Sequence, residues 1–216
     1  MKPSFQPITA EDWIREVKRA KKKSASSIFS KRTYSVYKCA ILSDRMTAVL
    51  IWFYNVLFQK NYYPRRWQSI VETTLEKGKG PVLGKLRSIT LIEGDLQLNM
   101  RIHFQAEQEE LIENDSRFSS ANYGSRKNYS IETALLQKRL VLDKSLIEMK
   151  PTIYNFTDLQ SCYDRQLANV GSIVEESVVR NRAAMKLCTR IMPQFKHFIS
   201  TGYGVSDNFY GGDEMI

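Results

Sequence analysis

Residues suited to disulfide or metal chemistry are scarce in this 216-residue chain, which has three cysteines and two histidines. Cys39, Cys162 and Cys188 are widely separated, so the sequence has neither a disulfide framework nor the short cysteine spacing of a zinc site. Such cysteine usage is typical of a reducing compartment. His103 and His197 also lack a metal-binding spacing, and we expect both to be packed or surface residues.

Long apolar runs are absent as well. The most apolar stretch, residues 47–58, is shorter than the roughly 20 residues that cross a bilayer. The N-terminus has no charged-then-apolar signal pattern, and Glu11 and Asp12 are atypical of a transit peptide. The sequence therefore predicts a soluble intracellular protein, in the nucleus or the cytoplasm, with no membrane partner.

Positive charge is plentiful: 32 lysines and arginines against 23 acidic residues give a net charge of +9. This balance favours an anionic partner, with nucleic acid ahead of an acidic membrane surface. A strongly basic, serine-interleaved segment lies at residues 18–32. It is either a loop that binds nucleic-acid phosphates or a solvated linker or localisation signal. Its candidate phosphate-binding residues are Lys21, Lys22, Lys23, Lys31 and Arg32.

Local patterns predict both helices and strands along the chain. Thr9, Ser43 and Ser130 each precede a helical stretch and suit the N-cap position. Two β-prone runs, residues 69–75 and 86–92, flank a turn rich in glycine and lysine and predict a hairpin. We expect helices at residues 9–22, 43–60, 96–113, 130–150, 164–170 and 175–192, a strand at 152–158, and a loose polar tail from residue 201.

The spacing of apolar residues predicts which side of each helix is buried. In residues 43–60 the predicted inward positions are Met46, Val49, Leu50, Phe53 and Leu57. In residues 130–150 they are Ile131, Ala134, Leu135, Leu142 and Leu146. In the last helix and just after it they are Ala184, Leu187, Cys188, Ile191 and Phe195.

Asp158 is an unusual residue for the end of an apolar strand. Thr152, Tyr154, Phe156 and Asp158 share one face of the expected strand at period two. A buried carboxylate is costly unless it is paired or bound to a metal. An aromatic residue, Tyr163, follows five positions later. The alternative is that Asp158 is a turn residue or a helix cap.

The order of Asp158 and Tyr163 resembles motif A of reverse transcriptases. The resemblance implies that Asp158 binds catalytic Mg²⁺, with the backbone carbonyl of Leu159 as a second ligand. It also implies that the ring of Tyr163 lies under the sugar of the incoming nucleotide and rejects a 2′-hydroxyl. The product would therefore be DNA.

A second stretch resembles the fingers of reverse transcriptases of retroelements. It comprises Pro64-x-x-Trp67, a strand that ends in Glu-Lys-Gly, a loop, Leu-Arg-Ser-Ile and an acidic turn. The resemblance implies that Arg87 contacts the nucleotide triphosphate, with Lys77 or Lys85 as its companion. Residues 123–126 resemble a segment of the family that lies along the template, which implies a template contact for Arg126.

Together these features predict an α+β protein with helix-rich fingers carrying a β-hairpin at residues 1–150 and the first part of a right-hand palm at 151–216. The implied function is RNA-directed DNA synthesis by two-metal nucleotidyl transfer, with Mg²⁺, an RNA template, a DNA primer and a dNTP. The sequence contains no Asp-Asp pair, so we expect this chain alone to be inactive. The alternatives are a non-catalytic, basic nucleic-acid-binding remnant and a structural protein whose charge serves solubility.

Overall fold

The structure is a computed structural model that describes part of the chain. The described residues are 5–21, 27, 29, 33–76, 86–105, 122–124, 129–153, 155, 157 and 181–211; for residues 76, 86, 87 and 105 only the backbone is described. The chain divides into two compact units. The first comprises Met1–Gln105 together with Asp164–Ile216, and the second comprises Ala106–Tyr163. The fold is mixed α+β, as the sequence predicts.

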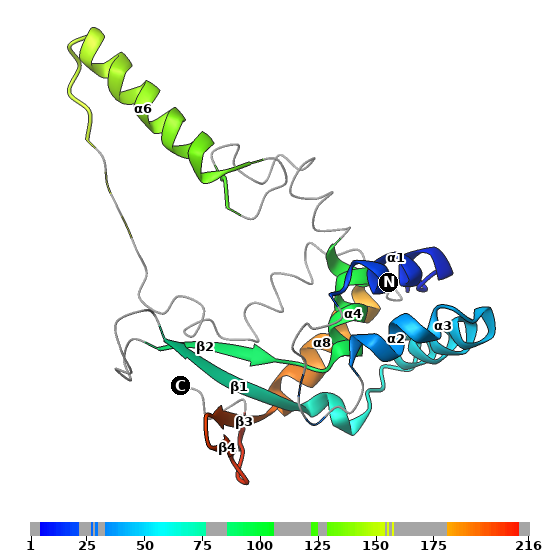
Figure 1. The fold of residues 1–216 in the computed structure, drawn as a ribbon. Coiled ribbons are helices and arrows are strands. Elements are labelled where there is room, and N and C mark those ends of the chain that lie inside the picture. Colours follow the sequence, from blue (N-terminus) through cyan, green and yellow to red (C-terminus); the bar gives the residue numbers. More distant parts are fainter. Residues whose placement is uncertain are drawn as a thin grey trace. The chain divides into compact units, whose positions relative to one another are not determined.

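The first unit contains five described α-helices that gather around the end of the sheet where β1 begins and β2 ends (Figure 1). They are α1 (Ala10–Arg19), α2 (Tyr34–Ala40), α3 (Asp44–Gln59), α4 (Gly94–Met100) and α8 (Arg182–Ile191). Shorter helical turns adjoin them: η1 (Arg65–Gln68), the π-helix η3 (Arg101–Gln105) and η4 (Met192–Gln194).

The predicted helix starts at Thr9 and Ser43 are confirmed. The Thr9 hydroxyl accepts the backbone N–H of Asp12 at 3.1 Å, and that of Ser43 accepts the N–H of Met46 at 3.4 Å. Both residues thus satisfy a backbone donor that has no partner within the helix. Helix α2 was not predicted. It is only seven residues long, and burial of Tyr34 and Tyr37 stabilises it.

The buried face of α3 differs from the predicted one. Leu57 is buried as predicted, and Leu50 and Phe53 are partly buried against the core, but Met46 and Val49 are about half exposed, at 50% and 52%. The fully buried positions are Leu57 and three that were not predicted: Thr47, Tyr54 and Phe58. Because α3 is apolar on most sides, periodicity alone does not select its inward face.

The sheet has five strands among the described residues: β1 (Ser69–Glu76), β2 (Leu86–Leu91), β3 (Lys196–Thr201), β4 (Gly204–Val205) and β5 (Tyr210–Gly211). The order is β2-β1-β3-β4, and β5 also pairs with β3. β1 and β2 form the predicted antiparallel hairpin, whereas β3 runs parallel to β1. The prediction of a loose tail was wrong for residues 201–211, because β4 and β5 fold back on β3.

The core of the first unit lies among its helices and is rich in aromatic rings. Trp13, Trp67 and Tyr54 are almost fully buried, and the rings of Trp13 and Tyr54 stack with centroids 5.0 Å apart. The predicted inward face of α8 is confirmed. Its buried residues include Ala184, Leu187, Cys188 and Ile191, with Phe195 packed beside them.

In the second unit, α6 (Ile131–Ile147) begins after Ser130, whose hydroxyl accepts the N–H of Thr133 at 3.3 Å. The prediction that this helix has an inward face was wrong for the part of the chain described. None of its residues is buried, and Ile131, Leu135 and Leu146 are largely exposed. Apolar residues occur all around this helix rather than along one stripe, so spacing gives no single face.

A buried histidine makes the stability of the first unit sensitive to acid. His103 is 6% exposed, its ring lies 4.4 Å from that of Phe58, and its Nδ1 accepts Asn181 Nδ2–H at 2.9 Å. Burial lowers the pKa of His103 to about 4, from 6.5 in the unfolded chain. The unfolded chain therefore takes up a proton first as the pH falls, and stability is lost between pH 6.5 and 4.

We expect the His103→Gln variant to lose this pH dependence. Between pH 7.5 and 5 the wild-type chain should lose about 2 kcal/mol of unfolding free energy through this histidine. Urea unfolding at the two pH values measures the difference, and His197→Gln is the matched control that should keep it. An equal loss in His103→Gln and the wild type would contradict the assignment.

Candidate functional site

The β1–β2 hairpin carries the predicted nucleotide contact. Arg87 lies in β2 opposite Leu75, near the end of the ribbon that leads to the turn. Towards the other end, Thr73 pairs with Ile89 and Val71 with Leu91. Val71 is fully buried, whereas Leu75 is 47% exposed. The hairpin is thus packed where it starts and exposed at Leu75, the residue that pairs with Arg87.

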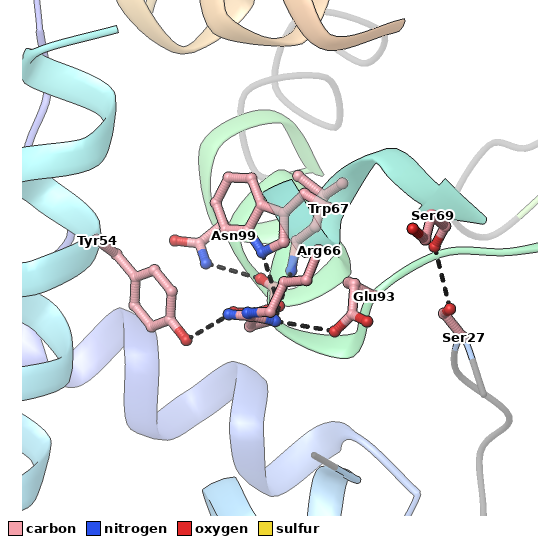
Figure 2. A network of polar contacts seen from close by, with 9 residues as sticks. Ser27, Tyr54, Arg66, Trp67, Ser69, Glu93 and Asn99 are labelled. Carbon is pink, nitrogen blue, oxygen red and sulfur yellow. Dashed lines mark hydrogen bonds and ion pairs between the residues drawn. The ribbon is translucent and has the colours of Figure 1, made fainter. Parts of the chain in front are cut away.

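A buried polar cluster holds the packed end of the hairpin together (Figure 2). The Asp95 carboxylate accepts hydrogen bonds from both terminal nitrogens of Arg66 and, at 2.9 Å, from Trp67 Nε1. It also accepts the Tyr54 hydroxyl at 3.0 Å, and Arg66 donates to Glu93 at 2.8 Å. We call Tyr54, Arg66, Trp67, Glu93 and Asp95 the hairpin clamp.

The electrostatics of the hairpin clamp keep Arg66 and Tyr54 protonated, so that both side chains donate hydrogen bonds. Burial disfavours the charge on Arg66, but the hydrogen bond and charge of Asp95 outweigh this effect and raise the pKa of the guanidinium. Burial and then Asp95 raise the pKa of the Tyr54 hydroxyl, so Tyr54 remains a donor. Asp95 is completely buried and paired, as a carboxylate in a protein interior must be.

The basic segment also touches the packed end of the hairpin. Ser27, which lies within residues 18–32, donates its backbone N–H to the carbonyl of Ile92 at 3.1 Å. Its hydroxyl donates to the carbonyl of Ser69, also at 3.1 Å (Figure 2). Ser27 therefore ties the segment to the start of β1 and to the residue that follows β2.

A second polar cluster lies across the sheet and was not predicted. Glu72 on β1 accepts His197 Nδ1–H on β3 at 2.8 Å and the Ser88 hydroxyl on β2 at 2.9 Å. Tyr210 on β5 also hydrogen-bonds to Glu72 and stacks on His197 with ring centroids 5.0 Å apart. The only signal in the sequence was that Glu72 and His197 each lie within a run of alternating side chains, as strand residues do.

The Glu72 cluster is suited to joining strands rather than to catalysis. The hydrogen bond from His197 is the main reason that the pKa of Glu72 lies below its usual value, with burial opposing it. Burial and the bond to Glu72 raise the pKa of Tyr210 to about 12. Each of the three donors is used by the same carboxylate, and the cluster connects four strands.

Most predicted site residues lie outside the described residues. These are Asp158, Leu159, Tyr163, Lys22, Lys23, Lys31, Arg32, Lys77, Lys85 and Arg126. Lys21 follows α1 and is exposed, and Arg87 is placed by the backbone of β2. The roles of all these residues stay predictions.

The strand predicted ahead of Asp158 is not formed at the positions described. Thr152, Ile153, Asn155 and Thr157 belong to no strand, and Ile153 is 94% exposed. Apolar alternation predicts a strand only where a neighbouring strand satisfies its backbone groups. Within the described ranges, β1 instead pairs with β2 and β3.

The groups expected to bind Mg²⁺, the Asp158 carboxylate and the Leu159 carbonyl, are among the residues not described. Elsewhere, in the residues that are described, no group of three or more histidine, cysteine or acidic side chains could hold a metal ion. Glu72 and Asp95 are bonded to protein donors instead.

Comparison of the sequence with models of protein families and with curated proteins finds no match. No helix in the described ranges has the length and apolar character needed to cross a membrane.

The hairpin clamp predicts a large effect for a nearly isosteric substitution. Asp95→Asn keeps the shape of the side chain but leaves the partly buried Arg66 with Glu93 as its remaining acidic partner. We expect the free energy of unfolding to fall by about 3 kcal/mol, measured by urea denaturation. Arg65→Gln, at the exposed neighbouring position, should change it by less than about 0.5 kcal/mol. Equal stabilities of the two variants would refute the role of Asp95.

Proposed function

We propose that this chain is the fingers and the first part of the palm of a reverse transcriptase, whose complete form makes DNA on an RNA template. The main support is the β1–β2 hairpin, which forms at the expected residues and carries Arg87 in its second strand. The two motif pieces that flank it in sequence, Trp67 and the acidic turn at Glu93 and Asp95, are in contact through the hairpin clamp. The division into fingers at 1–150 and palm at 151–216 is part of the proposal.

In this proposal the hairpin binds the incoming dNTP. The Arg87 guanidinium, with Lys77 or Lys85, pairs with the triphosphate through charge-assisted hydrogen bonds. The ring of Tyr163 packs under the sugar and excludes a 2′-hydroxyl. Because the hairpin clamp fixes the opposite end of the ribbon, the cations near the turn have a stable base.

The basic segment binds the RNA template and DNA primer. Its candidate residues are Lys21, Lys22, Lys23, Lys31 and Arg32, and Arg126 is a further template contact. The link from Ser27 to the hairpin supports this assignment, because it anchors the segment beside the nucleotide-binding element. Phosphate contacts of this kind make affinity fall steeply with salt.

Asp158 and the carbonyl of Leu159 are the proposed ligands for Mg²⁺, which prefers oxygen. Bound Mg²⁺ supplies charge stabilisation for the attacking and leaving oxygens of nucleotidyl transfer. That chemistry requires several carboxylates, and the 216 residues contain no Asp-Asp pair. This chain alone should therefore bind primer–template without extending the primer.

A non-catalytic, basic nucleic-acid-binding remnant is the second candidate. The net charge of +9 combined with the lack of an Asp-Asp pair favours it. Both candidates bind nucleic acid, but only the first uses Arg87 to bind a dNTP. The response to dNTP therefore separates them.

The test is binding of a fluorescent RNA–DNA primer–template over a salt series, with and without Mg²⁺ and the next dNTP. We expect dNTP to tighten binding, and Arg87→Ala to weaken that effect by about tenfold or more, because it removes a charge-assisted hydrogen bond. Arg45→Ala removes an exposed cation of α3 and is the matched control. Binding that no dNTP affects would support the remnant, and no binding at low salt would exclude both candidates.

A further inference from the structure

The exposed side of α8 carries positive charge only. Arg182, Lys186 and Arg190 are exposed and spaced four residues apart, and the helix contains no acidic residue. Its opposite side is buried in the core of the first unit. Residues four apart lie on the same side of a helix and are about 6 Å apart along its axis, so the three cations extend over about 12 Å.

Helices α1 and α6 arrange many of their exposed cations differently. On α1, Arg15 pairs with Asp12 at 2.7 Å, and Arg19 pairs with Glu16 at 3.0 Å. On α6, Arg139 pairs with Asp143 and Lys144 with Glu148. An ordinary solvated helix mixes the two signs in this way, because like charges four residues apart are mutually destabilising.

Within the described ranges, no ion pair of this kind involves α8. Among the described residues, Arg182 and Lys186 have no acidic partner, and Arg190 instead donates to the carbonyl of Asn61 at 2.8 Å. The guanidinium of Arg190 also lies 5.8 Å from the centre of the Tyr63 ring. The resulting α8 surface, formed by Arg182, Lys186, Arg190 and Tyr63, combines aligned cations with an aromatic ring.

We infer that the α8 surface binds the phosphate backbone of nucleic acid. Aligned cations release condensed counterions when they contact phosphates, and an aromatic ring beside them suits contact with sugar or base. An acidic membrane is a poorer partner, because a membrane-binding helix also exposes large apolar side chains. None of the exposed large apolar residues in the described part of the chain lies on α8.

This inference rests on the proposed function, because it requires that the chain binds nucleic acid. It adds a surface that is separate in sequence from the β1–β2 hairpin and the basic segment. Contacts to phosphate carry no sequence information, so the α8 surface should add affinity for any duplex rather than select a template.

The test compares wild-type chain with the double variant Arg182→Gln and Lys186→Gln in binding to a 20-base-pair RNA–DNA duplex across a salt series. We expect affinity to fall roughly fivefold or more at 0.1 M salt, and the slope of log K against log salt to become shallower by roughly 1.5. Both replaced side chains are exposed, so the thermal midpoint should not change. Arg190 is kept because it bonds to Asn61 at the end of α3.

Two further variants and one further probe make the result decisive. Arg45→Gln with Lys144→Gln removes the same charge from exposed positions on α3 and α6, and it should leave the slope nearly unchanged. Arg182→Lys with Lys186→Arg keeps the charge and should retain binding. Vesicles containing phosphatidylserine test the membrane alternative.

Each outcome has a distinct meaning. If the wild-type chain binds no duplex, both the proposed function and this inference fail. If it binds but the double variant behaves like the charge-matched control, the α8 surface is not used and the proposed function still stands. If the double variant loses vesicle binding while its duplex binding stays at the control level, the surface belongs to a membrane and the inference is overturned.

Discussion

The carboxylate of Asp95 is the point on which the first unit depends. It is fully buried and accepts hydrogen bonds from Tyr54, Arg66, Trp67 and the backbone of Leu96. Those donors come from α3, η1 and α4, so one charged group fixes three helical elements. Removing such a group from water costs several kcal/mol, and only this full set of partners offsets the cost.

The carboxylate of Asp95 also holds the sheet in position against the helices. Trp67 is two residues before β1, and Asp95 is four residues after Leu91, the last residue of β2, so one interaction closes the hairpin at its packed end. β1 in turn pairs with β3, and the Glu72 cluster ties β5 to the same strands. The helices therefore hold β1 in place, and β1 holds the other strands. Leu75 and Ile89, towards the turn, remain exposed.

Local signals in the sequence were enough for those parts of the fold that neighbouring residues determine. The caps at Thr9, Ser43 and Ser130 and the hairpin are of this kind. The inward face of α3 is not, because Tyr54 bonds to Asp95, 41 residues away. The prediction also failed for the described strands after residue 201, β4 and β5, because each has only two residues and exists through pairing with β3. For the same reason the hairpin clamp was visible in the sequence only as a motif and an acidic turn.

Several acidic residues are already paired within the protein, which bears on where the net positive charge of +9 is exposed. Glu72, Glu93 and Asp95 are used to hold the first unit together, and Asp12, Glu16, Asp143 and Glu148 pair with cations on α1 and α6. A surplus spread evenly over a surface would act mainly on solubility. Here α8 has three exposed cations and no acidic residue, so part of the surplus is concentrated on one side of one helix. A concentrated surplus is what a polyanion can exploit, because each contacted phosphate releases its own counterions.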